Sequence, residues 1–374
     1  MTTTKNNEHK KLNVPNLRFP EFQGEWEKCI LGDITENFNL RNKDKIQYPM
    51  FSVTNDRGFI PQSEQFEGRD MVGEDIKAYK IIHSNDFAYN PARINVGSIA
   101  MYTGEKPCMI SSLYVCFKTT KEVNNEWLMQ LLKTPKMNYY YNVNGEGGVR
   151  VYLFYPNFAR IRMFIPKIEE QKKIAKLLNL IDERIATQNK IIDKLQSLIK
   201  GIGKQLFMDN QNWRTVKIGE LLRIGNGKDY KHLSIGKIPV YGTGGQMLLV
   251  NDYLYDGESV CIGRKGTIDT PMFLKGKFWT VDTLFYTYDF KDVLPKFCYY
   301  LFLQINWKLY NEGTGVPSLS KSTIENIKVK IPSLEQQHKI CSILDCYEHK
   351  TNNEEQILEL YHSEKQYLLR QMFI

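Results

Sequence analysis

Apolar side chains recur at alternating steps of three and four residues through a stretch of about 40 residues near the middle of the chain. Polar and charged residues fill the positions between them, and Gln188 occupies the one vacant seam position. The apolar members are Ile174, Leu177, Ile181, Ile185, Ile192, Leu195, Ile199, Ile202 and Leu206. This heptad pattern predicts an amphipathic helix roughly 60 Å long.

The same stretch returns at the end of the chain, where residues 331–373 repeat residues 165–207 at one constant offset. The repeat identity includes the pairs Ile165/Ile331, Pro166/Pro332, Glu169/Glu335, Gln171/Gln337, Lys173/Lys339, Ile174/Ile340, Leu178/Leu344, Gln205/Gln371 and Phe207/Phe373. The second seam runs through Ile340, Ile343, Tyr347, Leu358, Tyr361, Leu368 and Met372, with Thr351 and Glu354 in its middle. Both prolines suit the first turn of a helix. An internal repeat of this length favours an intramolecular, antiparallel coiled coil over two unrelated helices that each pack on their own domain.

A globular unit precedes each predicted long helix, and a tryptophan opens each unit. Trp26 and Trp213 are both followed, six residues later, by Gly-Asp or Gly-Glu. Short aromatic runs bounded by Gly, Asn, Asp and Pro then predict strands, for example at 86–90 and 113–117 in the first unit and at 259–262 and 283–288 in the second. Short helices are expected at 126–132 and 295–303, followed by a Gly-rich loop and a short strand that enters the long helix.

The expected fold class is therefore α+β, with two β-rich domains joined by two long antiparallel helices in a pseudo-twofold repeat. Residues 209–212 form a polar linker between the halves. The expected bounds are a disordered tail at 1–15, a first domain at 16–164, a central helix at 165–208, a second domain at 209–330 and a C-terminal helix at 331–374.

The composition narrows the class of protein without deciding it. The net charge of +8 over 374 residues permits a polyanionic partner. The seven cysteines are scattered and contain no C-x-x-C pair, which favours a reduced protein without structural zinc. The sequence lacks an 18-residue apolar run and an N-terminal hydrophobic signal core, so we expect a cytoplasmic protein.

Motifs that would indicate catalysis in this chain are weak. Tyr89-Asn90-Pro91-Ala92-Arg93 is only partly similar to the catalytic loop of adenine methyltransferases, and a turn after a strand explains it better. The glycine-rich segments at 225–228, 242–245 and 263–267 fit neither the P-loop nor the dinucleotide fingerprint, and hairpin turns are expected there. Glu170-Gln171-Lys172 is expected on a solvated helix face. The chain is thus predicted to be no enzyme, with no catalytic, cofactor-binding or metal site of its own.

Loops that combine cationic, amide and aromatic side chains are more informative. Arg and Lys can bind guanine O6 and N7, Asn and Gln can bind adenine, and glycines let backbone amides approach phosphates. Each loop by itself is as compatible with an ordinary surface as with contact, whereas the set on two domains favours DNA reading. The candidate DNA-binding residues are Arg57, Tyr89, Asn90, Arg93, Asn95, Arg150, Lys228, Tyr230, Tyr241, Thr243, Gln246, Arg264, Lys265 and Thr267.

These motifs together resemble the specificity subunit of type I restriction–modification systems over essentially the whole chain. The most specific are I-P-x-x-E-x-Q-x-K-I at the start of both long helices, Trp-x5-Gly-(Asp/Glu) at the start of both units, and two unlike middles containing residues 90–98 and 262–267. The resemblance implies two target recognition domains, each reading one half of a bipartite, asymmetric target in double-stranded DNA through the major groove. It also implies that the helices set the spacing and dock two methyltransferase subunits, which would hold S-adenosylmethionine. Motor–nuclease subunits using ATP and Mg would join for cleavage.

Physical dimensions are compatible with this division of labour. Two readers on one face of a duplex sit about 34 Å apart, within reach of rods of roughly 60 Å. Two other classes of protein remain open from the residues alone, namely a stand-alone DNA-modifying enzyme such as a methyltransferase or nuclease, and a coiled-coil interaction scaffold. The absence of cofactor and metal motifs argues against the enzyme.

Overall fold

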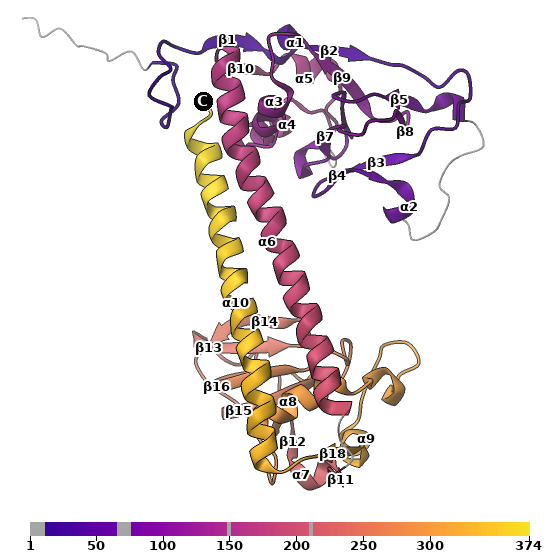
Figure 1. Cartoon of the computed structure of the whole chain (residues 1–374), viewed down its shortest axis with the longest axis vertical. Coiled ribbons are helices and arrows are strands. Elements are labelled where there is room, and N and C mark those ends of the chain that lie inside the picture. Colours follow the sequence, from indigo (N-terminus) through magenta and orange to yellow (C-terminus); the bar gives the residue numbers. More distant parts are fainter. Residues whose placement is uncertain (1–11, 66–75, 148–150, 209–211) are drawn as a thin grey trace, which may run out of the picture. The chain divides into compact units, whose positions relative to one another are not determined.

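The computed structural model describes residues 12–65, 76–147, 151–208 and 212–374 (Figure 1). The chain divides into two compact units. Unit 1 comprises Met1–Thr187 with Leu358–Ile374, and unit 2 comprises Gln188–Ile357. Each unit therefore contains one β-rich domain together with one portion of each long helix.

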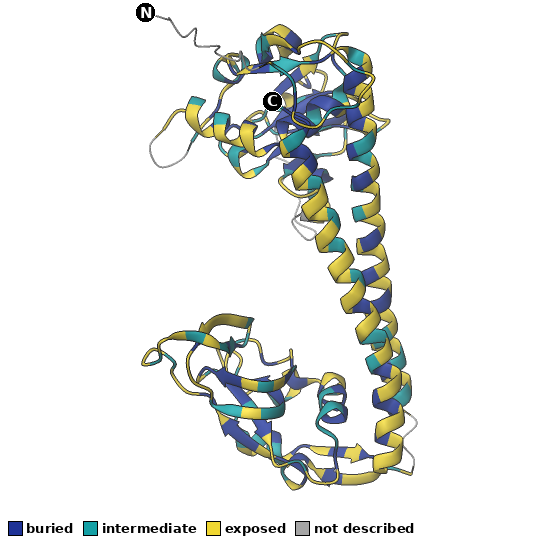
Figure 2. Cartoon of the chain, turned by 90° about the vertical axis from the view of Figure 1, so that its left-hand side faces the viewer, coloured by how far each residue is buried: buried dark blue, intermediate teal, exposed yellow. Residues whose placement is uncertain are grey.

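The two predicted long helices are present as α6, Ile168–Met208, and α10, Leu334–Gln371. Within unit 1, the start of α6 and the end of α10 share one hydrophobic core, in which Ile174 and Ile181 accompany Leu368. Lys365 of α10 also forms an ion pair with Asp182 of α6. Figure 2 shows buried residues recurring along the two helices.

Unit 2 pairs the other ends of the two helices in the same antiparallel sense. Phe207, near the end of α6, lies in one core with Ile340 and Leu344, near the start of α10. An α+β fold with two long paired helices is thus confirmed, and the antiparallel pairing is seen within each unit.

A polar contact replaces the apolar seam at the position where equivalent residues of α6 and α10 face each other. The buried Gln188 donates from its Nε2 to the Glu354 carboxylate at 2.6 Å and to the Glu354 carbonyl at 3.0 Å. These two residues occupy the same position in the two copies of the repeat, as two equivalent residues must where antiparallel copies cross. Thr351 is buried nearby and donates to the Tyr347 carbonyl at 3.0 Å. Polar residues at a seam position can specify register in coiled coils, and here only Gln188 of the pair is fully buried.

Two details of the predicted helices were wrong. Pro166 and Pro332 do not lie in the first turns, because the helices begin at Ile168 and Leu334, two residues later. Their carbonyls instead accept hydrogen bonds from Gln171 and Gln337. Ile343, assigned to the seam, is 42% exposed.

The domain of unit 1 contains several small antiparallel sheets. The largest has the order β2-β9-β6-β7, and three further pairs are β1-β10, β3-β4 and β5-β8. The strands are β1 Glu27–Ile30, β2 Thr35–Phe38, β3 Phe51–Thr54, β4 Gly58–Pro61, β5 Lys80–Ile82, β6 Phe87–Tyr89, β7 Ile99–Met101, β8 Cys108–Ile110, β9 Val115–Thr119 and β10 Arg162–Ile165. The helices are α1 Leu31–Ile34, α2 Gln62–Gln65, α3 Asn125–Leu132, α4 Pro135–Asn144 and α5 Tyr155–Ala159, with 3-10 turns η1 Ile76–Ala78 and η2 Ile94–Val96.

The domain of unit 2 is built on one mixed six-stranded sheet of order β12-β17-β15-β16-β13-β14, beside a separate β11-β18 pair. The strands are β11 Arg214–Lys217, β12 Arg223–Asn226, β13 Ile235–Gly242, β14 Gly245–Val250, β15 Tyr255–Gly263, β16 Met272–Thr280, β17 Leu284–Tyr288 and β18 Lys328–Ile331. The helices are α7 Ile218–Leu221, α8 Pro295–Gln304 and α9 Lys321–Asn326, with the 3-10 turn η3 Trp307–Tyr310. The predicted strands and short helices of both domains are confirmed. The domains differ in their largest sheets, which have four strands in unit 1 and six in unit 2.

The parts that the two domains share lie next to the long helices. In each unit the first strand pairs with the strand that enters the long helix, in equivalent registers that place Glu27 opposite Ile165 and Arg214 opposite Ile331. The carboxylate of Asp33 then accepts a hydrogen bond from the Ile30 amide at 2.9 Å, at the start of α1.

Glycine in the repeated Trp-x5-Gly motif is required by close packing. A Cβ at Gly32 would lie 3.1 Å from the Cβ of Ala159 in α5, and a Cβ at Gly219 would lie 2.9 Å from the Cβ of Glu325 in α9. The acidic residue after the second glycine, Glu220, accepts from the Lys217 amide at 3.3 Å, as Asp33 does in unit 1.

The repeated glutamine of the long helices joins each helix to its domain. Gln171, 1% exposed, accepts from the Asn124 amide at 2.8 Å and donates to the carbonyls of Glu122 at 3.1 Å and Pro166 at 2.8 Å. The corresponding Gln337 accepts from the Leu294 amide at 2.8 Å and donates to the carbonyls of Asp292 and Pro332. In unit 1 this glutamine holds the loop that leads into α3, and in unit 2 the equivalent glutamine holds the loop that leads into α8.

Glu170 and Gln171 are buried, so the expectation of a solvated face was wrong for both. Arg18 donates to the two carboxylate oxygens of Glu170 at 2.8 and 2.7 Å, and the indole of Trp26 donates to the same carboxylate at 3.2 Å. The partners lie far away in the sequence, and the charge of Glu170 is buried only because Arg18 neutralises it. Of the tail predicted at 1–15, residues 1–11 lie outside the described part of the chain, and Asn13 bonds to Glu25.

Candidate nucleic-acid interface

Three of the predicted loops of unit 2 meet at one end of its sheet. Lys228 follows β12 and donates its amide to the Thr280 carbonyl at 2.8 Å, at the end of β16. Val281, which follows Thr280, donates its amide to the Tyr241 carbonyl at 3.0 Å, at the end of β13. A Cβ at Gly266, in the loop after β15, would lie 3.6 Å from the hydroxyl of Thr243. The tertiary structure therefore brings together loops that the sequence presents as separate.

The backbone around these loops is held firmly while several cationic side chains remain exposed. The Lys228 carbonyl accepts from the Trp279 indole at 2.8 Å, and the Lys228 side chain is exposed. A Cβ at the preceding Gly227 would lie 1.8 Å from the Val281 carbonyl, so only glycine fits there. A rigid loop that carries an exposed cation suits a surface that must hold a side chain at a defined place.

A basic groove extends from these loops toward α9. The Arg264 amide donates to the Thr283 carbonyl at 2.8 Å, and the Arg264 carbonyl accepts from the Leu319 amide at 2.9 Å. The side chains of Arg264 and Lys265 are exposed, and both line the groove. Its full lining is Asn226, Arg264, Lys265, Phe285, Ser318, Leu319, Ser320 and Lys321. Lys321 and Asn226 were missed from the sequence, although Asn226 stands in a glycine-rich segment that had been noted.

The remaining candidates of unit 2 divide between exposed and packed side chains. Gln246 and Thr267 are exposed. Tyr230 and Tyr241 are half-buried, and their rings pack against the apolar clusters around Val240 and Phe278 respectively. The glycine-rich segment at 242–245 is the β13–β14 hairpin turn, as predicted.

In unit 1, the turn between β3 and β4 lies beside the loop that follows β6. A Cβ at Gly97, whose φ is +98°, would lie 3.4 Å from the Cβ of Asn55. Asn95 donates to the Asn142 side chain at 3.0 Å. Asn55 and Asn95 line one pocket with Ile94, Val96, Gly97, Ile99, Leu132, Lys133, Thr134, Asn138 and Tyr141. The amide groups and the Lys133 ammonium share this pocket with apolar side chains, and amide groups are able to hydrogen-bond to base edges.

The other candidate residues of unit 1 differ in the exposure of their side chains and in the contacts that those side chains already make. Arg93 is exposed, and its carbonyl accepts from the amides of Val96 and Ser98, which makes a tight turn. The Asn90 side chain accepts from the Ala92 amide at 3.0 Å. Arg57 is exposed but lies 3.7 Å from the Glu64 carboxylate. Of the two described cations among these candidates, Arg93 is therefore the more open to a ligand, and Arg150 lies outside the described residues.

Tyr89 was a wrong choice as a DNA-contacting residue. Its side chain is 0% exposed and packs against Phe117 and Phe158 in the core. Burial raises the pKa of its hydroxyl well above the ordinary value. An aromatic residue beside an asparagine looks the same in the sequence whether the ring faces the core or the surface.

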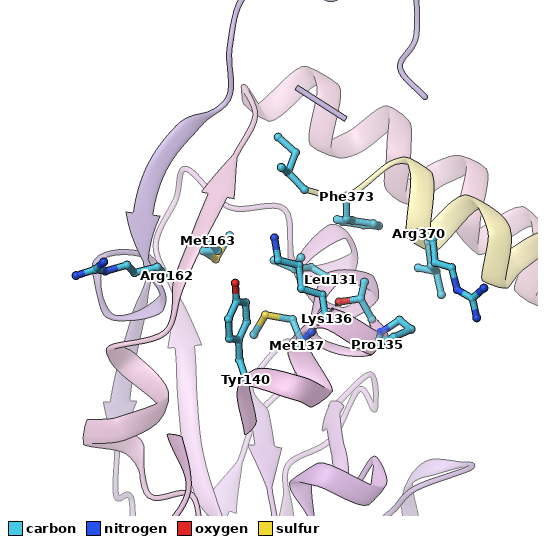
Figure 3. A pocket seen from close by; sticks show the side chains of 12 residues that line it. Leu131, Pro135, Lys136, Met137, Tyr140, Arg162, Met163, Arg370 and Phe373 are labelled. Atoms are coloured by element: carbon cyan, nitrogen blue, oxygen red, sulfur yellow. Dashed lines mark hydrogen bonds between the residues drawn. The ribbon is translucent and has the colours of Figure 1, made fainter. Parts of the chain in front are cut away.

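A separate apolar pocket lies at the end of α10 in unit 1. Figure 3 shows Met163, Leu131 and Phe373 around this cavity, with the guanidinium groups of Arg162 and Arg370 pointing away from it. The ring of Phe373 also packs beside that of Trp127 in a tilted arrangement, with ring centroids 5.9 Å apart. The pocket is thus a gap at the edge of the core, and it brings together no acid–base pair.

Two properties of the described residues bear on metal binding and on thiol chemistry. In that part of the chain, no group of three or more His, Cys, Asp or Glu side chains could hold a metal ion. The buried thiols are poor nucleophiles, since burial raises the pKa of Cys261 and of Cys116 to about 12. No helix among the described residues is both long and apolar enough to span a bilayer.

Two unlike domains on a repeated helical frame, each presenting cationic and amide side chains on neighbouring loops, define a two-domain recognition protein. Both halves of the chain match the family model described as the type I restriction modification DNA specificity domain, over residues 23–197 and 210–360. The chain belongs to this family.

Two relatives from Methanocaldococcus jannaschii extend over nearly the whole chain. The protein described as the type I restriction enzyme MjaX specificity subunit is 24% identical over 409 aligned residues, which cover 93% of this chain and 94% of that protein. The MjaVIII specificity subunit is also 24% identical, with 91% and 90% covered.

Solved structures of similar proteins share the fold. The crystal structure of a type I restriction–modification S subunit from M. genitalium matches with a TM-score of 0.61 at 15% identity, covering 96% of this chain and 99% of that one. A second structure, described as the "structural basis underlying complex assembly and conformational transition of the type I R-M system", matches with a TM-score of 0.58 at 13% identity. It covers 92% of this chain and 96% of that one.

Proposed function

We propose that this chain is the DNA sequence-recognition subunit of a type I restriction–modification complex and that each domain reads one half of a bipartite target. The observation that carries the proposal is the family match in both halves of the chain. The unlike loop sets of the two domains support an asymmetric target, because loops of different sequence and geometry present different patterns of hydrogen-bonding groups to the base edges. The methyl-transfer and cleavage activities belong to partner subunits.

The partners follow from the same proposal. The two copies of the long-helix repeat offer equivalent surfaces, so they suit two copies of one methyltransferase subunit. These subunits would supply S-adenosylmethionine and methylate adenine, and motor–nuclease subunits with ATP and Mg would join for cleavage. The second solved relative, which is described in terms of complex assembly, supports a role within a larger complex. A cytoplasmic location accords with these partners.

The test is to map adenine methylation in cells that express this chain together with its methyltransferase partner. The wild type should produce one new split motif with a modified adenine on each strand. Arg93→Ala should relax or weaken recognition in one half of that motif only, and Arg264→Ala should do so in the other half. A lost bidentate contact to a base costs about 1–3 kcal/mol, or roughly 5- to 150-fold in discrimination.

Arg223→Ala is the matched control, since this arginine is exposed at the opposite end of β12 from Lys228. It should leave the motif unchanged. An unaltered motif in both loop variants would mean that Arg93 and Arg264 do not read bases. If the folded, assembled complex methylates no new motif, the chain is an interaction scaffold instead.

A further inference from the structure

The segment Asn13–Gly24, which we call the strap, covers a groove between the long helices in unit 1. The Leu17 amide donates to the Gln371 carbonyl of α10 at 2.9 Å, and Arg18 bonds to Glu170 of α6. The ring of Phe19 packs against the core beneath the Lys173 ammonium, which lies 4.6 Å from the ring centroid. Lys173 also forms an ion pair with Glu21.

The repeat produces the same groove in unit 2, where an open pocket is found. Each of the eight residues that line it has a counterpart in unit 1, and the counterparts include the residues that hold the strap. The lining consists of Ile202, Gln205, Leu206, Trp213, Gln336, Lys339, Ile340 and Ile343. In the same order, the counterparts are Leu368, Gln371, Met372, Trp26, Glu170, Lys173, Ile174 and Leu177.

The groove of unit 2 is more exposed than its counterpart. Trp26 is 3% exposed, whereas Trp213 is only half-buried. Met372 is buried, whereas Leu206 is half-buried, and Ile343 is 42% exposed. Contiguous apolar side chains left open between polar residues mark a binding surface.

Among the residues that the structure describes, no second strap covers this groove. In unit 1 the strap precedes Trp26, whereas in unit 2 only four residues stand between the end of α6 at Met208 and Trp213. The sequence segment before Trp213 that corresponds to the strap before Trp26 contains the last residues of α6. An occupant that follows the pattern of the strap would therefore come from another molecule.

Resting on the proposed role as one subunit of a complex, we propose that this groove binds an extended segment of a partner protein. The segment carries an aromatic side chain followed two residues later by a carboxylate, as Phe19 and Glu21 are arranged in the strap. Lys339 is available for both contacts, because its present ion pair with Glu335 is exposed, and such pairs contribute little stability. Gln336 replaces Glu170, so the partner needs a neutral residue where the strap has Arg18.

The probe is a labelled peptide with the sequence of residues 12–24 and the change Arg18→Gln, titrated into the full-length chain and followed by fluorescence anisotropy. Binding should be saturable and should weaken about tenfold or more with Ile343→Glu, which places a charge against the apolar segment. Ile357→Glu, at an exposed position of the same helix outside the groove, should change it less than twofold. A photo-crosslinker in place of Phe19 should label the α10 segment around Ile343.

A reversal of specificity keeps the test decisive if the Ile343 variant is poorly folded. Gln336→Glu restores the carboxylate found in unit 1, so it should make a peptide that retains Arg18 bind about tenfold tighter than the Arg18→Gln peptide. Absence of saturable binding, crosslinks confined to unit 1, or equal effects of the two isoleucine variants would overturn the proposal. Self-association of the chain that Ile343→Glu abolishes would also overturn it, since the occupant would then be a second copy. None of these readouts involves DNA or methylation, so they are separate from the test of the proposed function.

Discussion

Replacing Gln171 by leucine should destabilise unit 1 although the two side chains are similar in size. The change removes one hydrogen bond from the Asn124 amide and two to the carbonyls of Glu122 and Pro166. Glutamine and leucine have similar helix propensities, so α6 itself is unaffected. The effect will therefore report on the attachment of the α3 loop to the long helix.

The expected magnitude follows from the three bonds. Each contributes about 1 kcal/mol net, and a buried group left without a partner costs about 1–3 kcal/mol. Since water can reach the partly buried Glu122 carbonyl, we expect a total loss of about 3 kcal/mol. For a unit of about 200 residues this corresponds to a Tm lower by roughly 6–12 °C.

The assay is calorimetric unfolding of the full chain, in which the transition of unit 1 should move. Gln196→Leu, at an exposed position of the same helix, is the control and should change stability by no more than about 0.5 kcal/mol. A shift in Gln171→Leu no larger than in this control would refute the view that Gln171 holds the domain to the helix. Gln337→Leu should produce the equivalent loss in unit 2, and the double variant should be additive because the two sites share no partner.

Two further predictions concern pH and the helix pair. Burial raises the pKa of Asp86, against the opposing hydrogen bond from the His83 amide, so the folded state binds the proton more tightly than the unfolded state. The unfolding free energy should therefore fall as pH rises from the unfolded pKa through the raised folded one, and Asp86→Asn should flatten that slope in urea titrations between about pH 3 and 7. Ile181→Asp and Ile192→Asp each bury a charge in the helix pair and should cost several kcal/mol and disrupt assembly, as seen by circular dichroism and sedimentation. Ile191→Asp, at an exposed neighbouring position, should be tolerated, and equal effects of all three would contradict the paired-helix arrangement.

Features with a local signature were predictable from the sequence. The three–four spacing and the repeat identified both long helices. Residues on one face of a helix recur every three or four positions, whatever that face packs against. The short helices at 126–132 and 295–303 were confirmed as α3 and α8, since the Asn124 cap of α3, the proline that begins α8 and the apolar faces of both helices are encoded in neighbouring residues. Candidate loops could be selected by residue type, and Arg264 and Lys265 do lie together on a groove; their contacts with bases stay predictions.

Features that depend on segments far apart in the sequence were decided by the tertiary structure alone. Glu170 reads as a surface residue of a charged helix, yet it is 2% exposed because Arg18, 152 residues away, packs over it. Tyr89 lies at the end of a predicted strand, beside a polar turn, but faces the core, since the direction of one side chain on a short strand depends on which sheet face the other strands cover. The open groove beside Trp213 likewise exists because α6 takes the place of a strap. Local patterns determine which elements form, whereas the burial of a particular side chain depends on what the rest of the chain brings against it.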